Sequence, residues 1–198
     1  MPILIRDVRE DELELVMALN NSAGPSILPM DAEKVRFFWE NADYFRVMEQ
    51  DQAVTGFLVG FNHEAPHDSP NFRWFTERHK DFLYIDRIVI AAVRRGGGRG
   101  RAFYADAMSF AEPRWSALCC EVFLGVGYDP ALLFHGSFGF REVGQQTMDG
   151  TGLRACMLMK DLCSHEWIEA TYGDKLPNEP WLAARKAVAA GLQPSSGT

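Results

Sequence analysis

Apolar residues recur along the chain with two different periods, which separate predicted helices from predicted strands. Spacings of three and four, as for Leu13, Val16 and Leu19, predict amphipathic helices. Short apolar or alternating runs between turn residues predict strands. Helices are expected over residues 11–20, 31–41, 100–111 and 130–137, and strands over 3–8, 44–49, 53–61, 82–90, 117–124, 140–148 and 153–160.

Residues 63–80 fit neither period. They are polar and aromatic, contain two prolines, and are interpreted as an insertion between two strands. Three aromatic residues in this segment could form an apolar wall or lid over a site, or they could anchor the segment to the core; these are Phe72, Trp74 and Phe75.

The end of the chain lies outside the pattern of alternating strands and helices. Residues 163–198 are interpreted as a C-terminal extension, with a helix over 179–191 and a disordered end from residue 193. The rest of the chain, residues 1–162, is long enough for one compact domain.

Composition and charge exclude several classes of protein. Apolar residues make up 47% and charged residues 24% of the 198, which is ordinary for a globular protein. The net charge of -7 argues against a nucleic-acid partner. No signal peptide and no apolar run of membrane-spanning length is visible, so a cytoplasmic location without membrane contact is expected. The four cysteines lack metal-ligand spacing, so we expect reduced, mostly buried thiols and no metal.

The stretch from Ile88 to Arg101 is the strongest sequence signal for a binding site. A β-branched run, Ile88, Val89 and Ile90, is followed by a turn rich in glycine and arginine and then by a helical pattern. Glycines allow backbone N–H groups to approach an anion, and a helix N-terminus favours negative charge. The turn comprises Arg95, Gly96, Gly97, Gly98, Arg99, Gly100 and Arg101.

The spacing of this turn excludes two common phosphate-binding motifs. A P-loop needs Lys followed by Ser or Thr after its last glycine, where this chain has Arg101 and Ala102. The dinucleotide pattern G-x-G-x-x-G fails because its third glycine would fall on Arg101 or Phe103. An RNA-binding Arg-Gly segment and a plain flexible loop stay open at this point.

Two motifs together resemble the GNAT family, the Gcn5-related N-acetyltransferases. Arg95, Gly98 and Gly100 fit R-x-x-G-x-G, the pyrophosphate-binding turn of that family. The later segment PALLFHGSFGF, residues 130–140, fits its A-x-x-F-Y helix and the Gly-Phe pair that follows. The element order β-α-α-β-β-β-α-β-α-β-β also matches. The resemblance implies an α/β (α+β) domain with a mixed, mostly antiparallel twisted sheet flanked by helices.

The resemblance also implies a function and a division of roles. An acetyl group would pass from acetyl-coenzyme A to an amine of a small molecule or protein, with a homodimer left open. The turn from Arg95 to Arg101 and Phe134 would bind the coenzyme, and the backbone of Ile88, Val89 and Ile90 would hold its pantetheine arm and thioester. Many members have an asparagine where this chain has Tyr128, which leaves side-chain contacts there undefined.

The groups that move protons are less certain from sequence. His135 replaces the usual tyrosine acid of the family, and it could protonate the departing thiolate or only pack beside the coenzyme. Glu121 and Asp86 are the candidate bases, Tyr84 is a third, and a water chain or simple ion pairs are the alternatives. Asp86 lies two residues before Ile88 and is therefore expected on the same side of the strand.

Polar residues after the first helix are expected to line the acceptor pocket; these are Asn20, Asn21 and Ser22. The competing hypothesis from another class is a module that binds or senses acyl-coenzyme A without catalysis.

Overall fold

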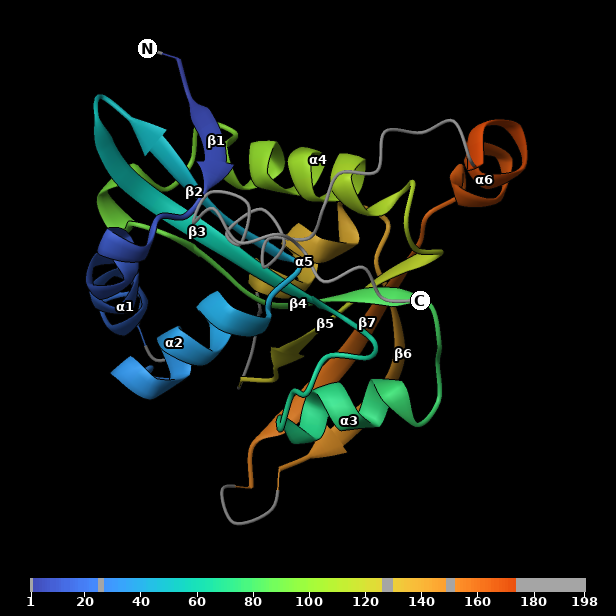
Figure 1. Ribbon diagram of the computed structural model, residues 1–198. Helices are drawn as coiled ribbons and strands as arrows, with labels where there is room; N and C mark the ends of the chain where they lie inside the picture. Colours follow the sequence, from blue (N-terminus) through green and yellow to red (C-terminus); the bar gives the residue numbers. More distant parts are fainter. Residues whose placement is uncertain (1, 25–26, 126–129, 149–151, 174–198) are drawn as a thin grey trace.

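The structure is a computed structural model that describes residues 2–24, 27–125, 130–148 and 152–173. Its centre is a seven-stranded sheet in the order β1-β2-β3-β4-β5-β7-β6 (Figure 1). The strands are β1 (Leu4–Asp7), β2 (Tyr44–Gln50), β3 (Ala53–Asn62), β4 (Phe82–Ile90), β5 (Ala117–Phe123), β6 (Arg141–Thr147) and β7 (Arg154–Asp161). The predicted strands are confirmed to within two residues at each end.

All neighbouring strands are antiparallel except β4 and β5, which run parallel. The pairing between β4 and β5 is short. Phe82, Leu83 and Tyr84 pair in turn with Ala117, Leu118 and Cys119, and the two strands do not pair with each other beyond these residues. The two strands therefore diverge towards their C-terminal ends. This divergence opens the sheet at its centre.

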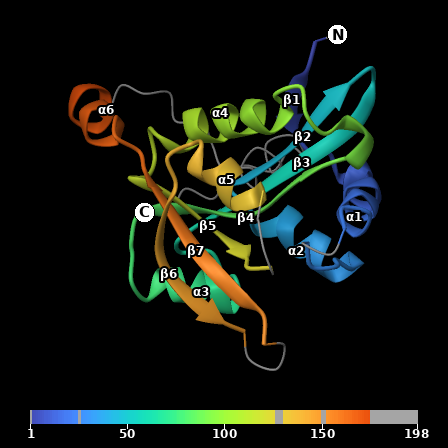
Figure 2. The ribbon, with the colours of Figure 1, turned by 180° about the vertical axis from the view of Figure 1, so that it is seen from behind.

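Helices cover both faces of the sheet (Figures 1 and 2). One apolar core lies under α1, α2 and α3, and a second lies under α4 and α5. Side chains of β4 enter both cores, with Tyr84 and Val89 in the first and Leu83 and Ile85 in the second. The helices are α1 (Leu13–Asn21), α2 (Ala32–Asn41), α3 (Pro70–Thr76), α4 (Arg99–Ala111), α5 (Pro130–Gly136) and α6 (His165–Tyr172).

Local sequence signals explain several helix ends. The carboxylate of Asp31 accepts a hydrogen bond from the Lys34 backbone N–H at 2.8 Å and so caps α2, as its position before the helix predicts. Helix α4 ends at Ala111, two residues before Pro113, which has no N–H to continue it.

Two helices were not predicted from the sequence. The insertion contains α3, which has Ser69 as its cap and Pro70 at its first position. Helix α6 lies at the start of the C-terminal extension. The helix expected over 179–191 and the residue Tyr128 lie outside the described residues. Among the helices that are described, none is long and apolar enough to cross a membrane.

Candidate functional site

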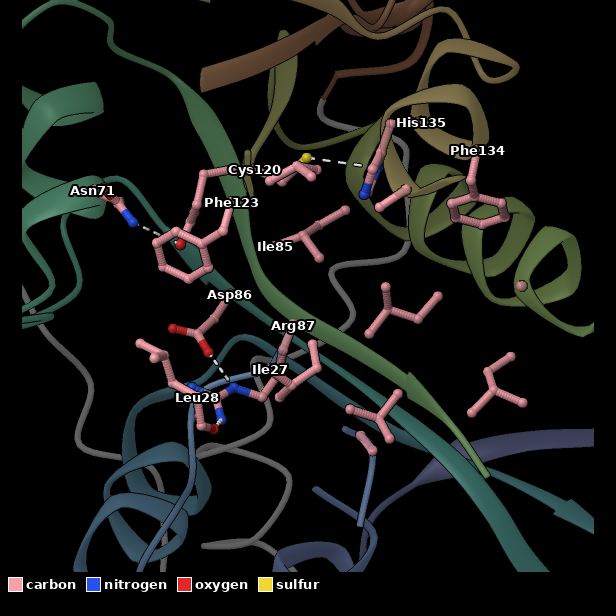
Figure 3. Close-up of a pocket in the computed structure, with 18 of the residues that line it drawn as sticks. Ile27, Leu28, Asn71, Ile85, Asp86, Arg87, Cys120, Phe123, Phe134 and His135 are labelled. Carbon is pink, nitrogen blue, oxygen red and sulfur yellow. Dashed lines mark hydrogen bonds and ion pairs between the residues drawn. The ribbon is translucent and has the colours of Figure 1, made fainter. Parts of the chain in front are cut away.

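A cavity of about 710 Å³ occupies the space where β4 and β5 diverge. Its walls come from the loop between α1 and α2, from both strands, and from the start of α3, the glycine turn and α5. Figure 3 shows side chains of β4 and β5 on its two sides, with His135 and Phe134 on one flank and Asn71 on the other. The cavity thus joins the glycine turn to Asp86 and Glu121, the acidic residues of the two strands.

The glycine turn has the backbone that its sequence predicts. Gly96, Gly97 and Gly98 have φ angles of +85°, +58° and +76°, a left-handed conformation that side chains disfavour. Helix α4 starts directly after them, and the first N–H groups of a helix have no partner within it. Residues without side chains directly before a helix N-terminus leave backbone N–H groups accessible to an anion.

Gly100 is required for a second reason. A Cβ atom at this position would lie 2.9 Å from the ring of Phe134, which packs from α5 against the first turn of α4. The two sequence motifs, which lie 30 residues apart, are therefore in contact in the fold. Both Gly100 and Phe134 line the cavity.

The three predicted arginines of the turn point in different directions. Arg95 lines the cavity and donates to the carbonyl oxygen of Ala23 at 2.8 Å. Arg99 donates to the side-chain oxygen of Gln50, and Arg101 lies over the ring of Phe138. Only Arg95 is therefore placed beside the cavity.

The end of β4 gives the cavity a backbone wall. Ile88, Val89 and Ile90 line the cavity and pair with β3 on one side only, because the pairing with β5 stops at Tyr84. A strand edge without a neighbour presents its N–H and C=O groups to whatever lies beside it. This edge can therefore bind an extended, amide-containing ligand through the backbone.

Glu121 of β5 is partly buried at the opposite end of the cavity. The Tyr84 hydroxyl donates to its Oε2 at 2.6 Å, and the side-chain amide of Asn71 donates to its Oε1 at 3.0 Å. Burial is the main influence and, with the nearby charge of Asp86, raises the pKa of Glu121 to about 7, although both hydrogen bonds act in the opposite direction. A carboxyl group with this pKa can accept a proton near neutral pH.

Asp86 has a different environment. Arg87 donates to its Oδ1 at 2.6 Å and His67 lies 2.9 Å from its Oδ2. Burial alone would raise the pKa of Asp86, but these cation and hydrogen-bond partners outweigh it and lower the pKa to about 2. The ion pair considered as an alternative to a catalytic role is therefore present at Asp86.

The expectation that Asp86 faces the same side as Ile88 is wrong. The register between β3 and β4 shifts at Val59, so that Asp86 is an extra residue in a β-bulge. A bulge interrupts the alternation of side chains, and Asp86 reaches His67 on the α3 face whereas Ile88 packs on the α4 face.

His135 lines the cavity from α5 and is buried. Its Nδ1 atom lies 2.8 Å from the hydroxyl of Tyr104. The sulfur of Cys120 lies 3.7 Å from the same atom, a contact that Figure 3 shows. Burial raises the pKa of both Tyr104 and Cys120, so each keeps its proton as a partner of the imidazole. Sequence reasoning missed Tyr104 and Cys120 because both read as ordinary core residues.

The polar residues expected in the acceptor pocket have another position. Asn20 and Asn21 bond the backbone of Leu28 and Met30, and Ser22 bonds the carbonyl of Leu19. None of the three lines the cavity. They hold the loop whose apolar side chains, Ile27 and Leu28, line it instead.

The insertion contributes to the cavity through polar residues and not through its aromatic side chains. Phe72 and Phe75 are buried in the core and Trp74 packs on Gly144, so the three aromatic residues anchor the segment. His67 and Asn71 line the cavity instead. The Ser-Pro start of α3 was the sequence signal that could have located Asn71 on a helix.

A metal site is not apparent in the parts of the chain that the structure describes. No group of three or more His, Cys, Asp or Glu side chains there is arranged to hold a metal ion.

Comparison with known proteins places the fold. No protein-family model and no curated protein matches the sequence. Solved structures do match: Ard1 from Thermoplasma volcanium has a TM-score of 0.64 at 16% identity, covering 81% of this chain and 98% of its own. Ribosomal-protein-alanine N-acetyltransferase from Brucella melitensis has a TM-score of 0.59 at 24% identity, covering 80% and 99%. An N-acetyltransferase from Staphylococcus aureus Mu50 has a TM-score of 0.62 at 16% identity, covering 82% and 99%.

These similarities agree with the seven-stranded, mostly antiparallel sheet flanked by helices. The chain therefore has the fold of the GNAT N-acetyltransferases, as its two motifs predict.

Proposed function

We propose that this protein is an N-acetyltransferase that moves an acetyl group from acetyl-coenzyme A to an amine. The observation that carries the proposal is the cavity between β4 and β5, which runs from the glycine turn to the carboxyl group of Glu121. One end suits a phosphorylated acyl donor, and the other end has a group that can accept a proton near neutral pH.

The residues at the glycine end fit coenzyme A. The backbone at Gly96, Gly97 and Gly98 would hold the pyrophosphate, with the positive end of α4 behind it. The open edge of β4 from Ile88 to Ile90 would bind the amide groups of the pantetheine arm. Phe134 would pack beside the coenzyme, since it closes the gap between α4 and α5.

At the other end, Glu121 would serve as the base. The amine nitrogen attacks the thioester carbonyl, a C–N bond forms, the C–S bond breaks, and the amine proton passes to Glu121. A donor from the β4 backbone would stabilise the carbonyl oxygen as it becomes negative. Glu121 suits this role better than Asp86, because Asp86 is committed to Arg87 and His67.

The thiolate of coenzyme A also needs a proton. We place this role on His135, which lines the cavity between Phe134 and Cys120, with water as the alternative donor. Replacing His135 by alanine is expected to lower kcat about tenfold while the Kd for coenzyme A changes less. Steady-state kinetics and calorimetric titration of the same preparation measure the two effects. An unaltered kcat and pH profile would exclude the acid role.

The test of the function is a thiol-release assay with acetyl-coenzyme A and a panel of amines, followed by mass spectrometry of the product. The expected result is turnover of at least one amine with a mass gain of one acetyl group. Binding of acetyl-coenzyme A without turnover of any amine would contradict the proposal and favour a sensing module. Binding of RNA without affinity for coenzyme A would favour the nucleic-acid interpretation of the Arg-Gly turn.

A further inference from the structure

Helix α3 of the insertion connects to the candidate base through a continuous series of hydrogen bonds. The series starts at the β4 bulge, where His67 Nε2 lies 2.9 Å from Asp86. The backbone N–H of Ser69 donates to His67 Nδ1 at 3.1 Å, and the N–H of Asn71 donates to the Ser69 hydroxyl at 3.2 Å. These contacts fix the first turn of α3 against the sheet.

They also define the state of His67. Since Nδ1 accepts a hydrogen bond from the Ser69 N–H, the ring proton is on Nε2 and is donated to Asp86. The side chain of His67 is fully buried and surrounded by aromatic rings, among them Phe61 and Phe72. Both ring nitrogens are therefore committed, and His67 connects α3 to β4 without serving as a base.

Asn71 is the residue that this arrangement delivers to the site. Its Nδ2 donates to Glu121 at 3.0 Å, and its Oδ1 accepts from Gln146 Nε2 at 3.1 Å (Figure 3 shows the Asn71 bond). The side chain is 1% exposed, so an unmade hydrogen bond here would be costly. The hydrogen bond from Gln146 of β6 favours the amide orientation in which Asn71 Nδ2 faces Glu121.

The result is a carboxyl group held from two sides. Tyr84 donates to one oxygen of Glu121 and Asn71 donates to the other. A carboxylate oxygen has two acceptor sites, so each oxygen retains one for the amine proton. Asp86 is the charged group that acts on Glu121 most strongly; Arg87 balances its charge, and His67 only donates a hydrogen bond to it.

We propose that Asn71, presented by the insertion helix and oriented by Gln146, is a positioning residue that holds the Glu121 carboxylate ready to accept the proton of the amine. This inference rests on the proposed function, since it assigns a role to the surroundings of the proposed base. The inference is based on two hydrogen bonds, from Gln146 of β6 to Asn71 of α3 and from Asn71 to Glu121 of β5.

The experiment follows the protonation of Glu121 by infrared spectroscopy, independently of turnover. The carboxyl band that titrates is assigned by its loss in Glu121→Gln. In Asn71→Leu the titration midpoint is expected to rise by about one pH unit, because the lost hydrogen bond favoured the charged form. In Gln146→Leu it should rise by a smaller amount. An unmoved midpoint in a folded Asn71→Leu protein would overturn the proposal.

Two control variants test whether the shift in the titration midpoint is specific to Asn71 and Gln146 or follows from any similar substitution. Asn41 bonds only a carbonyl within its own helix, and Gln145 is the exposed neighbour of Gln146. Asn41→Leu and Gln145→Leu should leave the midpoint where it is in the wild type. If Asn71→Leu does not fold, the comparison of Gln146→Leu with Gln145→Leu decides, and equal midpoints in that pair overturn the proposal.

Kinetics on the same variants add a second readout. Asn71→Leu should lose most activity near neutral pH and regain part of it at higher pH, where Glu121 is again ionised. A loss that is the same at every pH would indicate a structural role and contradict the proposal. Failure of the wild type to acetylate any amine would instead refute the proposed function, whereas the infrared result would still stand.

Discussion

The two ends of the cavity are built in different ways. The glycine end consists of backbone from a short, continuous segment, the end of β4 and the start of α4. The acidic end consists of buried and partly buried side chains from α3, β4, β5 and β6, which lie up to 75 residues apart in the sequence. The first end can be recognised from a motif, whereas the second exists only once the chain has folded.

The difference also separates binding from chemistry. A backbone turn can hold a ligand that many proteins share, because its geometry depends on glycines and a helix end. A side-chain network can hold a proton acceptor and shape a pocket for one acceptor. Changes at one end should therefore affect coenzyme affinity, and changes at the other should affect turnover.

The largest expected effect is that of Glu121→Gln. The amide keeps the shape of the side chain but cannot accept the amine proton, so kcat should fall by about 10²–10³-fold. The Kd for coenzyme A, measured by calorimetry, should stay within about twofold. Glu33→Gln, at an exposed position of α2, is the control and should retain full activity. Equal losses of affinity and turnover would contradict the claim that one end of the cavity binds the coenzyme and the other end carries the chemistry.

Asp86→Asn tests the contrast between the two acidic residues. Arg87 would be left buried without its carboxylate partner, and the free energy of unfolding should fall by about 3 kcal/mol. Chemical denaturation measures this loss. The folded variant should keep turnover within about tenfold of the wild type, because Asp86 supports the fold and Glu121 accepts the proton. A loss of turnover as large as that of Glu121→Gln would reverse the assignment of the base.

Gly100→Val tests the other end. The valine side chain would enter the space of the Phe134 ring, and overpacking of this kind costs about 1–3 kcal/mol. Gly100 and Phe134 both line the cavity, so the shift that relieves this contact would narrow the space for coenzyme A, and its Kd should rise about tenfold to hundredfold. Gly136→Ala is the matched control, since a Cβ there meets nothing within 4 Å. An unchanged Kd in a folded Gly100→Val protein would contradict the proposal that this turn binds coenzyme A.

The smallest expected difference is in the response to pH. The active form of the base is the carboxylate, and the pKa of Glu121 is about 7. The value of kcat/KM should therefore fall as the pH is lowered through about 7, by close to tenfold per unit below it. Coenzyme affinity should change by less than about twofold over the same range. The range from about pH 6 to about pH 8 extends one unit to either side of this pKa. A flat kcat/KM profile over that range would contradict Glu121 as the base.

The sequence predicted the glycine end more completely than the acidic end. Hydrophobic periodicity located all seven strands, and the spacing of Arg95, Gly98 and Gly100 identified the turn. These features are local, so neighbouring residues suffice to recognise them. The side chains of Arg99 and Arg101 turn away from the cavity because Gln50 and Phe138 provide closer partners, which spacing cannot reveal.

At the acidic end, the sequence identified the candidates but not their roles. Alternation placed Asp86 beside Ile88, and a single bulge residue moved it to the other face. Asn71 was missed because α3 is only seven residues long, and because its aromatic residues were the candidates that the sequence pattern suggested. The choice between Glu121 and Asp86 depends on their partners, which come from distant segments of the chain.

The central claim is that the coenzyme lies between β4 and β5 with its thiol directed to Glu121. A crystal structure of the protein with coenzyme A tests it most directly. We expect the pyrophosphate against the backbone of Gly96–Gly100, the pantetheine arm along Ile88–Ile90, and the sulfur atom in the cavity between Glu121 and His135. Coenzyme bound elsewhere, or a thiol directed away from Glu121, would contradict the account.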